Sequence, residues 1–181
     1  MIDGSLKADH ISSRTIRAIN LRMEEDPVFY KKLSELILET IREYHQQRLS
    51  EAEYLKRAKE NEETFLKGQQ DDLPGAIQGK AIATSYFNLI TDLLTPFRQT
   101  ERKDQSAELA LEVDACFHAQ IFDGDKPIVD WQNNPDIEGK VKIALDDIFF
   151  DFQSKYNLEL DLNQLDELVE EVLKVARIRY N

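Results

Sequence analysis

VDWQNNPDI, at residues 129–137, holds the chain's single tryptophan and one of its clearest helix starts. Asn134 suits the N-cap, where its side-chain oxygen can accept a backbone N–H that lacks a partner within the helix. Pro135 then falls at the first helical position, which needs no N–H donor. Asp136 places negative charge at the positive end of the helix dipole. These signals predict a helix over 135–153.

The predicted helix carries apolar residues on two sides. Because an α-helix advances about 100° per residue, Ile143 and Phe150 fall nearly opposite its broad apolar stripe. We expect another helix of the protein to cover Ile143 and Phe150. The alternative is an exposed apolar spot rimmed by Asp146 and Asp147. The stripe itself should face the core and consists of Ile137, Val141, Ala144, Leu145, Ile148, Phe149 and Phe152.

Apolar periodicity and capping signals predict about six further helices. We expect a leading segment over 1–9 without regular structure, and second and third helices that are nearly continuous, with a bend near Leu49. The fourth helix is the most apolar and should lie at the centre of the core. The expected helices begin at Ser12 or Ser13, at Pro27 after Asp26, after the capping box of Ser50 and Glu53, near Ile82, at Asp104 or Ser106, and after Asp161 with Gln164.

The organisation expected from these elements is a single all-α domain over 1–181, a bundle of about seven helices. The stretch 68–79 contains two glycines, a proline and two aspartates, which is typical of a loop. A subdomain seam would fall there. No stretch shows the alternation of a convincing β-strand.

The formal net charge of −12 is unevenly distributed. Residues 1–60 carry 11 basic and 11 acidic side chains, whereas residues 121–181 carry 7 against 14. DNA-binding proteins draw much of their affinity from neutralised phosphates. The acidic C-terminal half is therefore a poor surface for duplex DNA, but it would suit a basic protein partner.

The sequence also bears on the cellular compartment. No apolar run approaches the roughly 20 residues of a membrane helix, and the N-terminus lacks the apolar region of a signal peptide. The single cysteine, Cys116, excludes an internal disulfide and fits a reducing cytosol. We expect a cytoplasmic protein with no membrane partner.

Several patterns occur in an order that resembles a known family. They are E-E-D-P-x-F-Y-x-K-L-S-E-L-I (24–37), R-L-S-E-A-E-Y-L-K (48–56), V-D-W-x-N-N-x-D (129–136), A-L-D-D-I-F-F-D (144–151) and L-D-x-x-x-L-D-E-L-V-E-x-V-L-x-V-A-R-x-R-Y (160–180). Together they look like the C-terminal helical domain of type I restriction enzyme R subunits. The resemblance runs from about Ile11 to Tyr180.

The resemblance implies that the chain is a C-terminal fragment of a larger R subunit, which drives DNA translocation and cleavage with ATP and Mg²⁺. The chain itself has no G-x-x-x-x-G-K-[ST] phosphate loop, so we expect no catalytic residue, cofactor or metal in it. Its implied role is to join the R subunit to the methyltransferase core, which the modification and specificity subunits form. DNA would be reached through the parent complex.

Two surfaces are candidates for binding. The first is a partner-binding surface made of Trp131, Ile143, Phe150, Asp146 and Asp147, although a lone Trp before a helix more often packs in a core. The second would contact DNA phosphates, an alternative that the net charge disfavours. Its residues are Arg14, Arg17, Arg22 and Arg48, with Arg42, Lys56 and Arg57 as further cations.

Other readings rest on weaker patterns. Asp114 and His118 share a helix face with Cys116 between them in sequence, but a metal would need further ligands. The three histidines include none in a Glu-x-x-His pair of the di-iron type. Asp146, Asp147 and Asp151 are better read as a solvated edge than as acid–base groups. An unrelated helical adaptor and, last, a small helical enzyme remain as rival classes.

Overall fold

The computed structural model describes residues 3–68 and 71–181, and in these ranges it contains seven α-helices and one two-stranded hairpin. The predicted all-α, bundle-like fold class is confirmed. The chain divides into two compact units, residues 1–72 and 73–181. The boundary lies inside the expected loop 68–79, of which residues 69 and 70 are outside the described residues. That residues 1–181 act as one domain stays a prediction.

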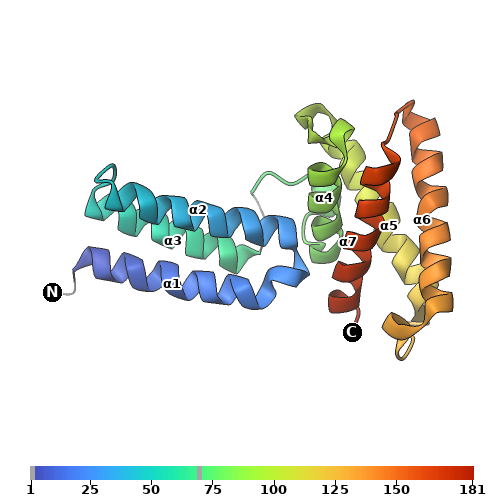
Figure 1. Cartoon of the computed structure of the whole chain (residues 1–181), viewed down its shortest axis with the longest axis horizontal. Helices are drawn as coiled ribbons and strands as arrows, with labels where there is room; N and C mark the ends of the chain where they lie inside the picture. Colours follow the sequence, from blue (N-terminus) through green and yellow to red (C-terminus); the bar gives the residue numbers. More distant parts are fainter. Residues whose placement is uncertain (1–2, 69–70) are drawn as a thin grey trace. The chain divides into compact units, whose positions relative to one another are not determined.

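The first unit consists of three helices that pack along their lengths (Figure 1). They are α1 (Gly4–Arg22), α2 (Pro27–His45) and α3 (Glu51–Lys67). A short three-ten helix, Met23–Glu25, links the first two. Two predicted starts are confirmed: the Asp26 side chain accepts the N–H of Phe29 at 3.1 Å, and Ser50 and Glu53 form a reciprocal capping box.

The start of α1 differs from the sequence prediction. The helix begins at Gly4 and not at Ser12 or Ser13, because the Asp3 side chain caps it by accepting the N–H of Ser5 at 3.2 Å. Ala8 is fully buried. A small buried residue contributes little to an apolar pattern, so the segment looked irregular. Residues 1 and 2 of the expected leading segment lie outside the described residues.

The nearly continuous helix expected around Leu49 is also wrong. The chain reverses direction after His45 through a tight turn in which Gln47 has a left-handed φ of 58°. The two helices then lie side by side, and an ion pair of 2.6 Å joins Arg57 of α3 to Glu43 of α2. Polar residues that can adopt a left-handed conformation terminate a helix without glycine.

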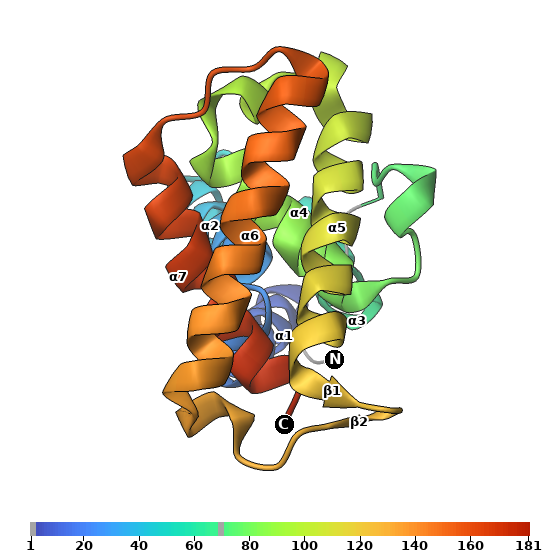
Figure 2. The ribbon, with the colours of Figure 1, turned by 90° about the vertical axis from the view of Figure 1, so that its right-hand side faces the viewer.

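The second unit is a four-helix bundle, with α5 and α6 side by side and the β1–β2 hairpin at one end (Figure 2). Each helix runs opposite to its neighbours, as shown by contacts such as Tyr86 with Phe117 and Thr95 with Gln164. Its helices are α4 (Ala81–Leu93), α5 (Lys103–Ile121), α6 (Pro135–Tyr156) and α7 (Leu162–Arg179). Its smaller elements are β1 (Phe122–Asp123), β2 (Lys126–Pro127) and the three-ten helices Gly75–Ile77, Thr95–Arg98, Thr100–Arg102 and Trp131–Asn133.

Helix α4 is the most deeply buried helix of the bundle. Every residue from Ala83 to Ile90 is buried, and α5 and α7 are the helices of the bundle that pack on it. This position suits the most apolar of the helices, although Thr84, Ser85 and Asn88 are buried along with its apolar residues. None of the helices in the described ranges combines the length and the apolar character that a membrane span requires.

Candidate interaction surface

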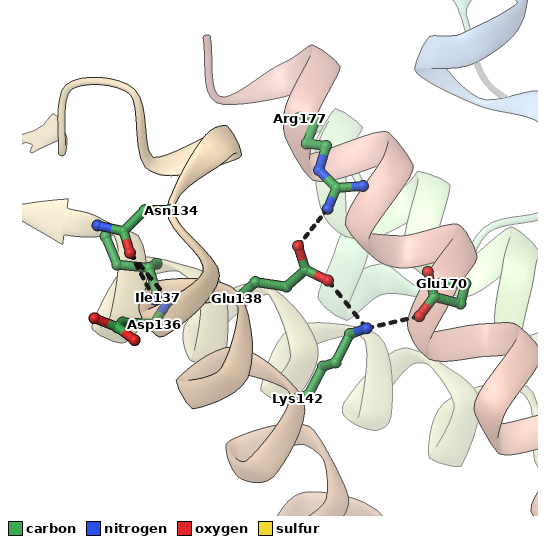
Figure 3. A network of polar contacts seen from close by, with 7 residues as sticks. All are labelled: Asn134, Asp136, Ile137, Glu138, Lys142, Glu170 and Arg177. Carbon is green, nitrogen blue, oxygen red and sulfur yellow. Dashed lines mark hydrogen bonds and ion pairs between the residues drawn. The ribbon is translucent and has the colours of Figure 1, made fainter.

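The start of α6 has the geometry that the sequence predicted. The Asn134 side-chain oxygen accepts the backbone N–H groups of Asp136, at 3.0 Å, and Ile137, at 3.3 Å (Figure 3). Pro135 occupies the first helical position. A well-capped start fixes the beginning of α6 and therefore the direction in which its side chains point.

Ion pairs tie one flank of α6 to α7. Lys142 lies 3.0 Å from Glu138 on its own helix and 2.8 Å from Glu170 on α7, while Arg177 of α7 lies 2.8 Å from Glu138 (Figure 3). The hydrogen bond from Lys142 lowers the pKa of Glu138, and Arg177 contributes in the same direction. The pKa of Lys142 is raised, first by Glu170 and then by Glu138. This α6–α7 network is chained through shared groups, which makes it stronger than isolated surface pairs.

The other flank of α6 is tied to α5. Glu108 of α5 accepts hydrogen bonds from the Lys155 ammonium and from the Tyr156 hydroxyl at the C-terminal end of α6. These two hydrogen bonds lower the pKa of Glu108. Contacts on both flanks hold α6 in place, and its outer face points away from the bundle.

The outer face of α6 is apolar and exposed. Ile143 is 65% exposed and Phe150 is 68% exposed, so the expectation that another helix covers them is wrong. Helix α6 packs against α5 and is ion-paired to α7, and its remaining side carries exposed residues. Helices α1, α2 and α3 of the first unit build a core of their own from residues such as Ile19, Tyr30 and Ile37. The prediction assumed that all seven helices share one core, and it therefore expected too many helices around α6.

Two carboxylates accompany the exposed apolar pair. Asp146 and Asp147 are both exposed and lie between Ile143 and Phe150 along the helix. Residues at spacings of three, four and seven share one helix face. We call this set the outer α6 face; it comprises Ile143, Asp146, Asp147 and Phe150.

Trp131 does not belong to that face. Its ring is only 2% exposed, and its indole Nε1 donates a hydrogen bond of 2.9 Å to the backbone carbonyl of Tyr180. The core reading that the sequence favoured is confirmed. A ring this buried cannot contact a partner directly, so its assignment to the partner-binding surface is wrong.

The four arginines considered for DNA contact lie in different surroundings. Arg14 forms an ion pair with Glu62 of α3. Arg22 binds Glu25 at 2.7 Å and lies over the Tyr30 ring. Arg17 and Arg48 are exposed, with Arg17 near the Ser13 carbonyl at 3.4 Å and Arg48 in the turn after α2. Two of the four charges are thus partly neutralised within the protein, and DNA contact stays a prediction.

The Asp114–His118 pair has protein partners. The Tyr180 hydroxyl donates to Asp114, and the His118 Nδ1 lies 3.8 Å from the Asp114 carboxylate. Cys116 is buried, and burial raises the pKa of its thiol to about 11. Within 3–68 and 71–181, no group of three or more His, Cys, Asp or Glu side chains is placed to hold a metal ion.

A further concave surface lies partly in the segment 1–9, for which the sequence predicted no regular structure. A groove of about 420 Å³ opens between α1 and α3. Its lining residues are Leu6, Lys7, His10, Ile11, Arg14 and Lys59. Of these, only Arg14 was singled out from the sequence. Asp3, as an N-cap, is the local signal that would have extended the helix over this segment.

Comparisons with known proteins identify no relative. No protein-family model, no curated protein and no solved structure matches the chain.

Proposed function

We propose that the chain is a non-catalytic assembly module that docks the motor and nuclease subunit of a type I restriction enzyme onto its methyltransferase core. Two lines support the proposal: the ordered sequence patterns over 24–180 that resemble the C-terminal helical domain of R subunits, and the outer α6 face. The partners proposed are the modification and specificity subunits, in the cytoplasm. ATP hydrolysis and DNA cleavage belong to other domains of the parent.

The observation that carries the docking role is the exposure of Phe150 and Ile143 on a firmly held helix. Large aromatic side chains at the centre of an interface contribute much of its binding energy. A helix whose flanks are already fixed loses little conformational freedom on binding. The carboxylates of Asp146 and Asp147 would favour a basic surface on the partner, in keeping with the net charge of −12.

Paired alanine variants test this role. Phe150→Ala should weaken binding to the purified modification–specificity complex by about tenfold or more, as expected for an interface anchor. Leu162→Ala is the matched control, because Leu162 is 75% exposed at the start of α7 and lies outside the outer α6 face. Calorimetric titration of both variants is the measurement. Equal affinities for the two variants would show that the outer α6 face is not the docking surface.

A further inference from the structure

The groove between α1 and α3, here the α1–α3 groove, is built by two parallel helices of the first unit. The Gly4 N–H donates to Glu51 at 2.5 Å, and the Tyr54 hydroxyl donates to Asp9 at 2.7 Å. Farther along, Arg14 pairs with Glu62. These cross-links follow the same order along both helices, so the groove walls are held in register.

Aliphatic and basic side chains line the groove together. Leu6 is 61% exposed and Ile11 is half-buried, so both present aliphatic surface to solvent. Lys7, His10 and Lys59 line the same space. Long basic side chains can cover apolar surface with their alkyl stems while their charged ends stay in water. Exposed apolar surface rimmed by polar residues is common at interaction sites.

Most of the basic side chains that line the groove are not paired within the part of the protein that the structure describes. Across the described residues, Lys7, His10 and Lys59 form no ion pair, whereas Arg14 contacts Glu62. Residues 1–72 carry 12 basic against 15 acidic side chains, a net charge of −3. Lys7 and Lys59 therefore offer two unpaired positive charges beside the aliphatic part of the groove, and they would attract an acidic ligand.

We propose that the α1–α3 groove binds an acidic amphipathic helix of another protein. The groove-lining part of α1 runs from Leu6 to Arg14, which at 1.5 Å per residue spans about 12 Å, or about two helical turns. A bound helix would therefore place two aliphatic anchors, one turn apart, on Leu6 and Ile11. Its flanking carboxylates would meet Lys7, Lys59 and Arg14, as in other helix-in-groove complexes.

The aliphatic part of the lining favours a peptide over a nucleic acid. A phosphate backbone would pair with the basic side chains but would leave Leu6 and Ile11 without an apolar partner. An amphipathic helix satisfies both parts of the groove at once. This site lies in a different unit from the outer α6 face, so it stands independently of the proposed docking role.

The test uses the full chain and a fluorescent synthetic peptide of Glu and Leu in amphipathic order, about 18 residues long, which exceeds the length below which isolated helices are marginal. Fluorescence anisotropy should give saturable binding. Exchanging Glu for Gln, or Leu for Ser, in the peptide should each abolish most of the affinity. The double variant Lys7→Glu with Lys59→Glu should weaken binding by about tenfold or more, because attraction is replaced by repulsion.

Controls separate the groove from general charge effects. Lys31→Glu makes the same charge change on α2, away from the groove, and should leave the affinity unchanged. Leu6→Ser should weaken binding, whereas Leu21→Ser, on the same helix and 88% exposed, should not. Unchanged melting midpoints establish that each variant is folded. The proposal is overturned if the Glu/Leu peptide fails to bind or if the Gln peptide binds equally well. It is also overturned if the groove variants bind the peptide as well as their controls do. Displacement of the peptide by a short DNA duplex would likewise overturn it.

Discussion

The indole Nε1 of Trp131 donates a hydrogen bond of 2.9 Å to the backbone carbonyl of Tyr180. This bond joins the turn before α6 to the residue that ends α7, two segments that lie 49 positions apart in the chain. Tyr180 in turn donates its hydroxyl to Asp114 of α5. One end of the four-helix bundle is therefore closed by a chain of contacts that passes through a buried tryptophan.

Removing the tryptophan should destabilise the bundle. Trp131→Phe leaves the Tyr180 carbonyl without its donor and should lower the free energy of unfolding by about 1–3 kcal/mol. Trp131→Ala should lower it by about 3–5 kcal/mol, because a cavity is added. Urea unfolding followed by far-ultraviolet circular dichroism is the measurement. Val129→Ala is the control, because Val129 is 93% exposed, and it should leave the free energy of unfolding unchanged. A Trp131→Ala protein as stable as that control would contradict the role of Trp131.

Two adjacent phenylalanines should behave in opposite ways. Phe149 is 1% exposed and Phe150 is 68% exposed. Phe149→Ala should lower the free energy of unfolding by about 3–5 kcal/mol through lost burial and a cavity. Phe150→Ala should change it by no more than about 0.5 kcal/mol, as is usual for surface positions. Thermal or urea unfolding of the pair measures this directly, and a costly Phe150→Ala would mean that α6 is covered on its outer side.

The α6–α7 network should make stability depend on pH at the acid end. The folded pKa of Glu138 is lowered from its ordinary value of 4.5, so the stabilisation from its carboxylate is present above pH 4.5 and is lost as the pH falls through the folded pKa. The effect is small because the pair is partly exposed. Glu138→Gln should therefore flatten the acid limb of a plot of unfolding free energy against pH. An identical acid limb in the variant would show that Glu138 contributes nothing there.

The buried thiol should resist modification. Burial raises the pKa of Cys116 to about 11, and the thiolate is the reactive form. At pH 8 only about one thiol in a thousand is ionised, so a thiol reagent should label the folded protein slowly and the urea-unfolded protein rapidly. The ratio of the two labelling rates is the measurement. Rapid labelling without denaturant would place Cys116 outside the core.

Any binding to duplex DNA should be weak and sensitive to salt. The affinity should fall steeply between low and physiological salt, because phosphate contacts release counterions. Glu62 already neutralises Arg14, so Arg17→Ala should weaken binding more than Arg14→Ala. Fluorescence titration over a salt series tests both points. Tight binding at physiological salt that neither substitution alters would locate the DNA contact elsewhere.

Features set by neighbouring residues were predictable from the sequence. The caps at Asp26, Ser50 and Asn134 each depend on a side chain and the two or three N–H groups that follow it, so the pattern contains all the partners. The all-α class was predictable for a similar reason, because helical periodicity is a pattern among residues three and four positions apart. The start at Gly4 was missed because only the small residue Ala8 marks the buried side of that segment.

Features set by distant parts of the chain were not predictable. Whether Ile143 and Phe150 are covered depends on which helices share a core, and the periodicity of one helix does not contain that information. The α1–α3 groove likewise depends on Lys59 of α3 lying beside α1, a relationship between positions far apart in sequence. Trp131 was correctly assigned to the core, but its partner, the Tyr180 carbonyl, is a backbone group that carries no sequence signal.

The most direct test of the assembly role is gel filtration of the full chain mixed with the assembled modification–specificity complex at micromolar concentrations. We expect one co-eluting peak that contains all the subunits. We also expect Phe150→Ala to shift the chain towards separate elution, while Leu162→Ala does not. Separate elution of the unaltered chain from the complex would contradict the assembly role.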